Sequence, residues 1–471
     1  MYTSALPSLA RPARRGQRST GKRHGIAAML MRWGTFGISL LLAVLIVGCG
    51  AARPATTAGP QNSTPRPPVP SGMTREPKAP AEEGPETSIE SNEEAGNIDA
   101  TREHHLPLVL FGTLIDGTGA EPLIDGALVV RGGRIAAVGR RDQIDIPSGA
   151  QVVDVPGTTI LPGLINAHVH NAYIGSNLKA WAMAGVTTVR DLGAPYGRNY
   201  LARRERLAGD PQHARLVAAG PLVTVPGGYP IAGNDFPSLT VTSAEDAREK
   251  ISALIDDGAD VIKITLTSGS APSLSPKEAA AIVEAAHARG VPVSAHATTA
   301  KDLERALDAG VDDVAHIATD RVSDKLIRRM VAANTSWVPT LAVLEGRGAS
   351  NLQRFLRAGG RVSLGNDAGY LDAVLVGLPA NELAALEAAG MSRMEIIAAA
   401  TRNAAAVCRL QDQLGTLEAG KIADVLVVAG DPLRDLDALK DVLIVVHQGI
   451  VIRREPPPET LPAGVVPSSP P

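Results

Sequence analysis

The chain is poor in cysteine and in aromatic residues, and its net charge is small. Its 471 residues include two cysteines, and Phe, Trp and Tyr together make up 3%. Two cysteines exclude a disulfide-stapled scaffold. Residues 1–49 hold seven Lys or Arg and no acidic residue, so the net charge of the remaining residues is more negative than the −3 of the whole chain. This negative charge argues against nucleic acid as a partner. The abundant small and branched apolar residues favour an α/β protein instead.

The first 49 residues predict an export signal. Basic residues precede the apolar run FGISLLLAVLIVGCG at 36–50, which is too short for an ordinary membrane-spanning helix. The run ends in Ile46-Val47-Gly48-Cys49, which resembles a bacterial lipobox. Residues 1–49 are then a lipoprotein-type signal peptide, and lipid on Cys49 anchors the exported chain to a membrane of the cell envelope, on its periplasmic or extracellular face. A plain signal peptide or an uncleaved anchor is the alternative.

Two segments have compositions that do not support a packed core. Residues 50–105 are rich in proline, contain no aromatic residue and end in acidic clusters, which predicts a disordered tether. Residues 456–471 have the same character and are expected to form a disordered tail. The folded body therefore lies between them.

The folded body changes its pattern twice along the chain. Residues 106–160 and 409–455 contain short β-rich runs separated by glycines, and Arg131-Gly132-Gly133-Arg134 indicates a hairpin. Residues 161–408 instead repeat a strand followed by a helix. Eight such strands predict a (β/α)8 TIM barrel at 161–408, with a small β-sandwich-like domain built from both chain ends.

Ionisable side chains stand at the ends of five of the eight predicted strands. The stretch LPGLINAHVH at 161–170 ends in two histidines on alternate positions, which point to the same side of a strand. A barrel places its chemistry at the carboxyl ends of its strands, and imidazole and carboxylate are ordinary ligands of zinc and related divalent ions. The six candidate ligands are His168, His170, Lys263, His296, His316 and Asp367.

The lysine is the unexpected member of this set, because an ammonium group cannot coordinate a cation. Burial and neighbouring positive charge both lower the pKa of a lysine. A neutral amine can react with carbon dioxide to give a carbamate, whose two oxygens can bridge two metals. With Lys263 in this form, the sequence offers enough ligands for a two-metal site.

Each candidate also has an ordinary structural interpretation. Lys263 in VIKI could reach solvent, and His296 and His316 could be hydrogen-bonded core residues. Asp367 in GNDAG could cap a helix or stabilise a turn. The shared register favours a site, since all six residues fall at or near the carboxyl ends of predicted strands.

An ordered set of motifs across residues 106–455 resembles the amidohydrolase superfamily. These motifs are GTLIDGTG, GLINAHVH, VIKI, SAHA, VAHIA, GNDAG and LGTLEAGKIADVLVV. The pattern is most similar to the prolidase-like branch, which hydrolyses Xaa-Pro dipeptides and N-acyl amino acids. Imidazolonepropionases and mononuclear deaminases are less similar, because they lack a bridging lysine.

The resemblance implies a metal assignment for each candidate ligand. His168, His170 and Asp367 would hold one divalent ion, and His296 and His316 would hold the other. The carbamate formed on Lys263 from carbon dioxide would bridge the two ions, with zinc as the expected metal.

One position departs from the pattern of the branch. Many members carry Gly-Gly-His after the third strand, whereas this chain has Gly227-Gly228-Tyr229 followed by Pro230. A phenol can still donate a hydrogen bond to a polarised carbonyl, but it cannot act as a base near neutral pH. Tyr229 is therefore a candidate catalytic residue, with a packing role as the alternative.

The expected function is hydrolysis of amide (C–N) bonds in small molecules such as dipeptides or N-acyl amino acids, by a hydroxide that two metals activate. Asp367 would serve first as general base and then as general acid. The alternatives are a lactone or ester hydrolase that uses the same site and a non-catalytic envelope protein that binds a ligand there. The expected partners are a small-molecule substrate, the membrane through Cys49 and, in a homo-oligomer, further copies of the chain.

Overall fold

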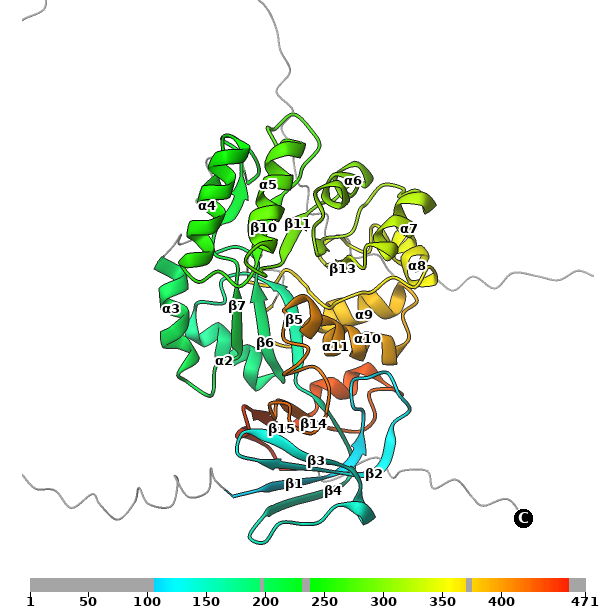
Figure 1. Ribbon diagram of the computed structural model, residues 1–471. Helices are drawn as coiled ribbons and strands as arrows, with labels where there is room; N and C mark the ends of the chain where they lie inside the picture. The colour runs from blue at the N-terminus through cyan, green and yellow to red at the C-terminus, as the bar shows by residue number, and fades with distance from the viewer. Residues whose placement is uncertain (1–105, 195–198, 231–237, 370–374, 457–471) are drawn as a thin grey trace, which may run out of the picture. The chain divides into compact units, whose positions relative to one another are not determined.

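The computed structural model describes residues 106–194, 199–230, 238–369 and 375–456 (Figure 1). The predicted signal peptide with Cys49, the tether at 50–105 and residues 457–471 of the tail lie outside the described residues, so export and lipidation stay predictions. Within the described part of the chain, no helix combines the length and the apolar character that a membrane crossing requires.

Parallel strands alternate with helices from Leu164 onward (Figure 1). Six of these strands form one sheet in the order β13-β12-β11-β10-β8-β9, and three form another in the order β5-β6-β7. The strands are β5 (Leu164–Val169), β6 (Val186–Asp191), β7 (Arg215–Ala218), β8 (Leu222–Thr224), β9 (Ser238–Thr240), β10 (Ile262–Thr265), β11 (Val293–His296), β12 (Asp313–Ala315) and β13 (Ser336–Val338).

Backbone contacts join the two sheets at both ends. The amide of Asp260, just before β10, donates to the carbonyl of Ala218 on β7. Parallel bridges from Trp337 and Val169 place the segment 362–368 between β13 and β5. Apart from β9, which lies at the edge of its sheet beside β8, the strands thus follow one another around a ring, as a (β/α)8 barrel requires, and the predicted α/β class is confirmed.

The third position of this ring differs from the simple prediction of one strand. It is divided into β7 and β8 at Gly220, which has φ +71°. A Cβ atom there would lie 3.3 Å from Leu254, and L-residues rarely adopt this φ. Glycine therefore permits the bend that separates the two short strands.

Helices follow the strands and pack against them through one apolar cluster. Several begin at residues that the sequence marks as caps: Ser243, Ser275, Thr299 and Ser323 each accept a hydrogen bond from the backbone N–H three residues on. The helices are α2 (Gly175–Met183), α3 (Asn199–Ala208), α4 (Ala244–Asp256), α5 (Pro276–His287), α6 (Ala300–Ala309), α7 (Asp324–Ala332), α8 (Ala349–Arg357), α9 (Ala380–Ala388), α10 (Arg393–Ala400) and α11 (Arg402–Val407).

Both ends of the folded body contribute to a second, smaller β-domain. Its strands form one seven-stranded sheet in the order β16-β15-β14-β4-β1-β2-β3. They are β1 (Leu108–Leu114), β2 (Leu123–Arg131), β3 (Arg134–Arg140), β4 (Gln151–Pro162), β14 (Val425–Ala429), β15 (Val442–His447) and β16 (Ile450–Arg454), with 3-10 turns η1 (Arg141–Gln143) and η2 (Leu436–Lys440).

The strand β4 connects the two chain ends, because it pairs parallel with β1 and antiparallel with β14. The hairpin expected at Arg131 and Arg134 joins β2 to β3. An antiparallel bridge from Arg134 to Ile422 brings β3 towards the segment before β14. A β-sheet domain from both chain ends is therefore confirmed, and in place of a β-sandwich its strands belong to one sheet, several of whose strands contribute to a shared apolar cluster.

A buried ion pair connects two strands of the barrel. The guanidinium of Arg190 on β6 donates two hydrogen bonds of 2.8 Å to the carboxylate of Asp313 on β12, and both side chains are fully buried. Arg190 also donates to the carbonyls of Ala167 and Val407, and Ser294 donates to Asp313. The pair therefore has its buried polar groups satisfied, which buried charges require.

Removing one partner of this pair should strongly destabilise the fold. We expect Arg190→Met to lower the free energy of unfolding by about 3–5 kcal/mol, because Asp313 would remain buried without a counter-charge. Urea denaturation measures the change. Arg248→Met is the matched control: its exposed ion pair with Glu284 should contribute no more than about 1 kcal/mol. Equal effects of the two substitutions would contradict the structural role of the buried pair.

Candidate metal centre

His168, His170 and Asp367 meet where β5 lies beside the segment 362–368. The carboxylate oxygen Oδ1 of Asp367 lies 3.2 Å from Nε2 of His168 and 2.9 Å from Nε2 of His170. The backbone amide of Asp367 donates to the carbonyl of His168, which fixes this register. The alternate spacing of the two histidines therefore brings both rings to one carboxylate, as the sequence predicted.

Two residues of the site have backbone conformations that L-residues rarely adopt. Asp367 has φ +60° and His316, which follows β12, has φ +68°. Such conformations cost on the order of 1–3 kcal/mol and occur most often at functional sites. The surrounding structure thus holds both side chains in position at some cost to stability.

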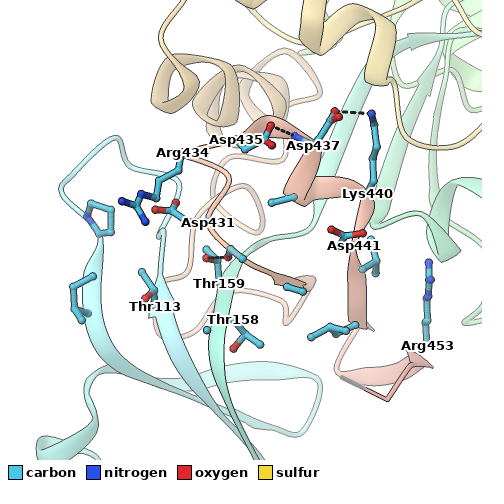
Figure 2. A pocket seen from close by; sticks show the side chains of 18 of the residues that line it. Thr113, Thr158, Thr159, Asp431, Arg434, Asp435, Asp437, Lys440, Asp441 and Arg453 are labelled. Carbon is cyan, nitrogen blue, oxygen red and sulfur yellow. Dashed lines mark hydrogen bonds and ion pairs between the residues drawn. The ribbon is translucent and has the colours of Figure 1, made fainter. Parts of the chain in front are cut away.

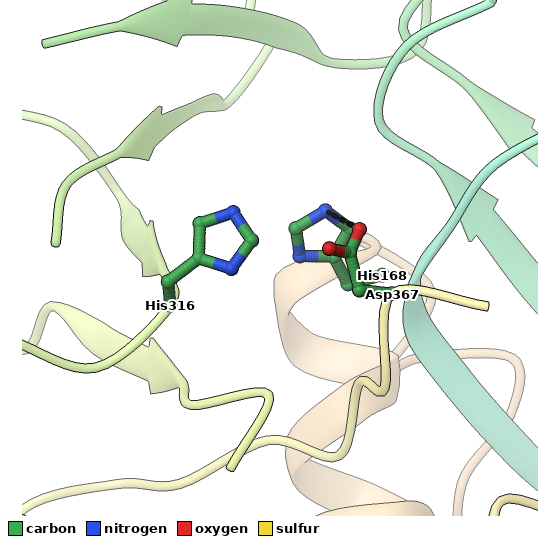
Figure 3. Close-up of side chains that lie close together, drawn as sticks. All are labelled: His168, His316 and Asp367. Atoms are coloured by element: carbon green, nitrogen blue, oxygen red, sulfur yellow. Dashed lines mark ion pairs between the residues drawn. The ribbon is translucent and has the colours of Figure 1, made fainter. Parts of the chain in front are cut away.

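The remaining histidines complete a close cluster. The ring centroid of His316 lies 4.9 Å from that of His168 and 4.5 Å from that of His296. One ligand atom each from His168, His316 and Asp367 lies within 4.8 Å of the others, a spacing compatible with a shared metal ion (Figure 3). The structure thereby brings together side chains that are separated by up to 199 positions in the chain.

Backbone and hydroxyl groups orient two of these rings through their second nitrogen. Nδ1 of His170 lies 2.9 Å from the carbonyl oxygen of Gly193, and Nδ1 of His316 lies 2.8 Å from Oγ1 of Thr340. Metal-binding histidines are commonly held in this way. Neither supporting group could be found from the sequence, because both come from loops and neither belongs to a motif.

Lys263 on β10 is 2% exposed, and its amine has no hydrogen-bond partner within the described residues. Burial lowers its pKa to about 7, although Asp313 and Asp367 partly oppose this. An unpartnered buried amine is costly. The environment of Lys263 therefore fits a lysine whose amine gains a bonding partner in the active protein.

Three of the four imidazoles, those of His168, His296 and His316, are held in the neutral form that binds metals. Burial, with the nearby charge of Lys263, lowers the pKa of His168 and of His296 to about 3, and burial also lowers the pKa of His316. His170 differs: burial alone would lower its pKa, but the hydrogen bond to Asp367, the charges of Asp367 and Asp191 and the contact with Gly193 together outweigh burial and raise the pKa. Burial opposes ionisation of Asp367, but His168 and His170 hold the pKa of this carboxyl well below its usual range.

One cavity of about 260 Å³ is lined by all six candidate ligands and by Tyr229. Its other walls are Leu222, Pro230, Thr298, Val343 and Leu344. The Tyr229 ring is 38% exposed and stacks on His296 with a centroid distance of 4.7 Å. The phenol therefore lies at the mouth of the cavity, next to the cluster. Four histidines, one carboxylate and a lysine without a hydrogen-bond partner among the described residues together form a donor set that fits divalent cations.

A second cavity, of about 840 Å³, lies against the small β-domain (Figure 2). Acidic side chains gather there, but several are already paired: Lys440 lies 2.5 Å from Asp437, and the amide of Asp437 donates to Asp435. Thr159 donates to the carbonyl of Gly430. None of the six candidate ligands lines this cavity, so the histidine cluster remains the candidate site.

Parallel strands that carry histidines and an aspartate at their carboxyl ends are typical of barrel-type metal-dependent hydrolases. The chain belongs to the Amidohydrolase family, which matches residues 159–451, more than half of its length. The predicted resemblance is thereby confirmed, and the chain is a hydrolase of a family that acts on carbon–nitrogen bonds.

Curated relatives include two imidazolonepropionases. The protein from Geobacillus sp. (strain WCH70) is 25% identical over 355 residues, which cover 64% of this chain and 83% of that protein. The protein from Deinococcus radiodurans is 27% identical over 358 residues, which cover 66% of this chain and 87% of that protein.

Solved structures with a similar fold include prolidases. A putative prolidase from Bifidobacterium longum has a TM-score of 0.66 and 29% identity, and the match covers 75% of this chain and 96% of that one. A Xaa-Pro dipeptidase with methionine bound in its active site has a TM-score of 0.67 and 24% identity, and the match covers 74% of this chain and 100% of that one. Phenylurea hydrolase B has a TM-score of 0.65 and 25% identity, and the match covers 74% of this chain and 97% of that one.

Proposed function

We propose that this chain hydrolyses amide bonds of small molecules such as dipeptides or N-acyl amino acids, with two divalent cations. The observation that carries the proposal is the cavity in which four histidines, one aspartate and one lysine from five separate segments of the barrel converge. The similarity to a putative prolidase supports an amide substrate of this kind.

The proposed assignment of ligands follows the family resemblance. His168, His170 and Asp367 would hold one cation, and His296 and His316 would hold the other, although in the structure ligand atoms of His168, His316 and Asp367 also lie within 4.8 Å of one another. Lys263, once carboxylated by carbon dioxide, would be a ligand of both, and zinc is the proposed metal. When bound, the cations lower the pKa of water and polarise the scissile carbonyl.

Residues of the chain position the substrate and move the proton. The carboxylate of Asp367 accepts a proton from the attacking water and delivers it to the departing nitrogen, as a general base and then a general acid. The hydroxyl of Tyr229 donates a hydrogen bond to the substrate carbonyl, where negative charge develops. The apolar walls at Leu222, Val343 and Leu344 contact the groups beside the scissile bond.

Lys263 favours a prolidase-like activity over that of the imidazolonepropionase relatives. A site for a single cation gives this buried amine no role, whereas a bridge between two cations does. A lactone or ester hydrolase would use the same side chains, so the substrate screen must include these compounds.

Metal analysis of the full chain tests the proposed function. We expect about two divalent ions per chain by mass spectrometry, and loss of hydrolysis on chelation with recovery on adding Zn²⁺. Libraries of dipeptides, N-acyl amino acids and lactones identify the substrate. Turnover that persists in the metal-free protein would contradict the proposal, and metal-loaded protein that binds these compounds without turnover would indicate a binding protein.

A further inference from the structure

Glu382 is a fully buried acid outside the metal-ligand set. It lies in the first turn of α9, the helix that follows the strand segment carrying Asp367. Its two carboxylate oxygens accept hydrogen bonds from two successive backbone amides, those of Leu341 (2.9 Å) and Ala342 (2.7 Å). One side chain thus ties α9 to the segment that follows β13.

The segment held by Glu382 forms part of the cavity wall. Val343 and Leu344, directly after the two bonded amides, line the cavity of the histidine cluster. On the other side of those amides, Thr340 bonds to the ring of His316. Two turn hydrogen bonds, from Glu345 to Ala342 and from Gly346 to Leu341, close the segment. The position of the wall therefore depends on contacts that begin at Leu341 and Ala342.

Among the described residues, no strand pairs with these two amides, and the carboxylate of Glu382 accepts their hydrogen bonds instead. Burial raises the pKa of Glu382 to about 7, against the effect of the two amides, which lower it. Burying a carboxyl group costs free energy unless hydrogen bonds compensate for the lost contact with water. A glutamine at this position would offer one acceptor and one N–H group, so one of the two amides would face another donor.

We propose that Glu382 is a positioning residue that holds the segment 340–346 and thereby sets the apolar wall that selects the substrate. Its effect on selectivity rests on the proposed amide hydrolysis, whereas its effect on the segment does not. Glu382 touches neither the reacting bond nor a ligand atom, and it acts through Val343 and Leu344.

Hydrogen exchange and substrate selectivity test this role together. In Glu382→Gln, exchange of the Leu341 or Ala342 amide should accelerate about tenfold or more, which corresponds to loss of one hydrogen bond to a charged group. The matched control is Glu387→Gln on the same helix, where the partly exposed Glu387 pairs with Arg393. Exchange at Leu341 and Ala342 should be unchanged in this control.

Selectivity is measured as the ratio of kcat/KM for hexanoyl and acetyl derivatives of the same amino acid. We expect this ratio to change about tenfold in Glu382→Gln and in Leu344→Ala, with the metal content unchanged, and to stay constant in Glu387→Gln. If Glu382 had a purely structural role, Glu382→Gln would lower the stability of the protein and leave the kcat/KM ratio unchanged. Unchanged exchange, or an unchanged ratio in Glu382→Gln, overturns the proposal.

Two further outcomes are decisive. If Glu382→Gln does not fold, the selectivity of Leu344→Ala decides whether the wall selects the substrate. An unchanged ratio of kcat/KM for the hexanoyl and acetyl derivatives in Leu344→Ala overturns this role of the wall. If the wild-type protein hydrolyses neither compound, the proposed function fails, while the exchange data still decide whether Glu382 holds the segment.

Discussion

Asp367→Asn should lower kcat by about 10²–10⁴-fold while most of the metal stays bound. Asparagine keeps a carbonyl oxygen where Oδ1 now lies 3.2 Å from His168 and 2.9 Å from His170, so one ligand atom is preserved. An amide cannot accept the proton of the attacking water at neutral pH, and the general base is lost. Steady-state kinetics and metal content on the same preparation measure the two effects.

The control for this substitution is Asp308→Asn, which removes a carboxylate that is largely exposed and pairs with Arg329 at the surface. Its kcat and metal content should equal those of the wild type. Full activity of Asp367→Asn would exclude the proposed base. Loss of both metal and activity would instead assign Asp367 a role in metal binding alone.

Lys263→Met should separate metal binding from folding. Methionine preserves much of the volume of the buried stem but removes the amine, and with it any carbamate. We expect bound metal to fall from about two ions to one or fewer per chain, with loss of hydrolysis. The metal-free variant should be at least as stable as the metal-free wild type, because the amine of Lys263 has no hydrogen-bond partner in the described structure. Mass spectrometry and thermal unfolding measure these outcomes.

Lys250→Met provides the comparison, since Lys250 pairs with Asp246 and donates to the carbonyl of Thr240, and none of these three residues lines the cavity of the cluster. Its metal content should not change. Growth with ¹³C-bicarbonate should give the wild type, but not Lys263→Met, a carbamate carbon signal in the NMR spectrum. Two ions per chain in Lys263→Met would contradict the bridging role.

The six candidate ligands could be predicted because their placement follows from local rules. Alternate residues of a strand share a side, and the carboxyl ends of parallel strands meet at one edge of a barrel. His168 and His170 obey the first rule, and His296 and His316, at the ends of β11 and β12, obey the second. Lys263 lies nearer the start of β10 than the rule predicts. Their convergence on one cavity does not depend on the exact length of any strand.

The supporting groups could not be predicted in the same way. Glu382 bonds to amides about 40 positions away, and the carbonyl of Gly193 meets His170 from a different loop. The division of the third strand into β7 and β8, and the single sheet of the small domain, likewise depend on pairings between distant segments. No short pattern marks such contacts, because each requires the fold to be already in place.

The sequence by itself determined the α/β class, the order of the metal-ligand candidates and the membership of both chain ends in a β-domain, since strand periodicity and residue type are local properties. The tertiary structure alone decided how Asp367 meets both histidines, which rings are held by Gly193 and Thr340, and which apolar side chains form the wall of the cavity. These features depend on distances between segments remote in the chain, and the packing of the whole barrel sets those distances.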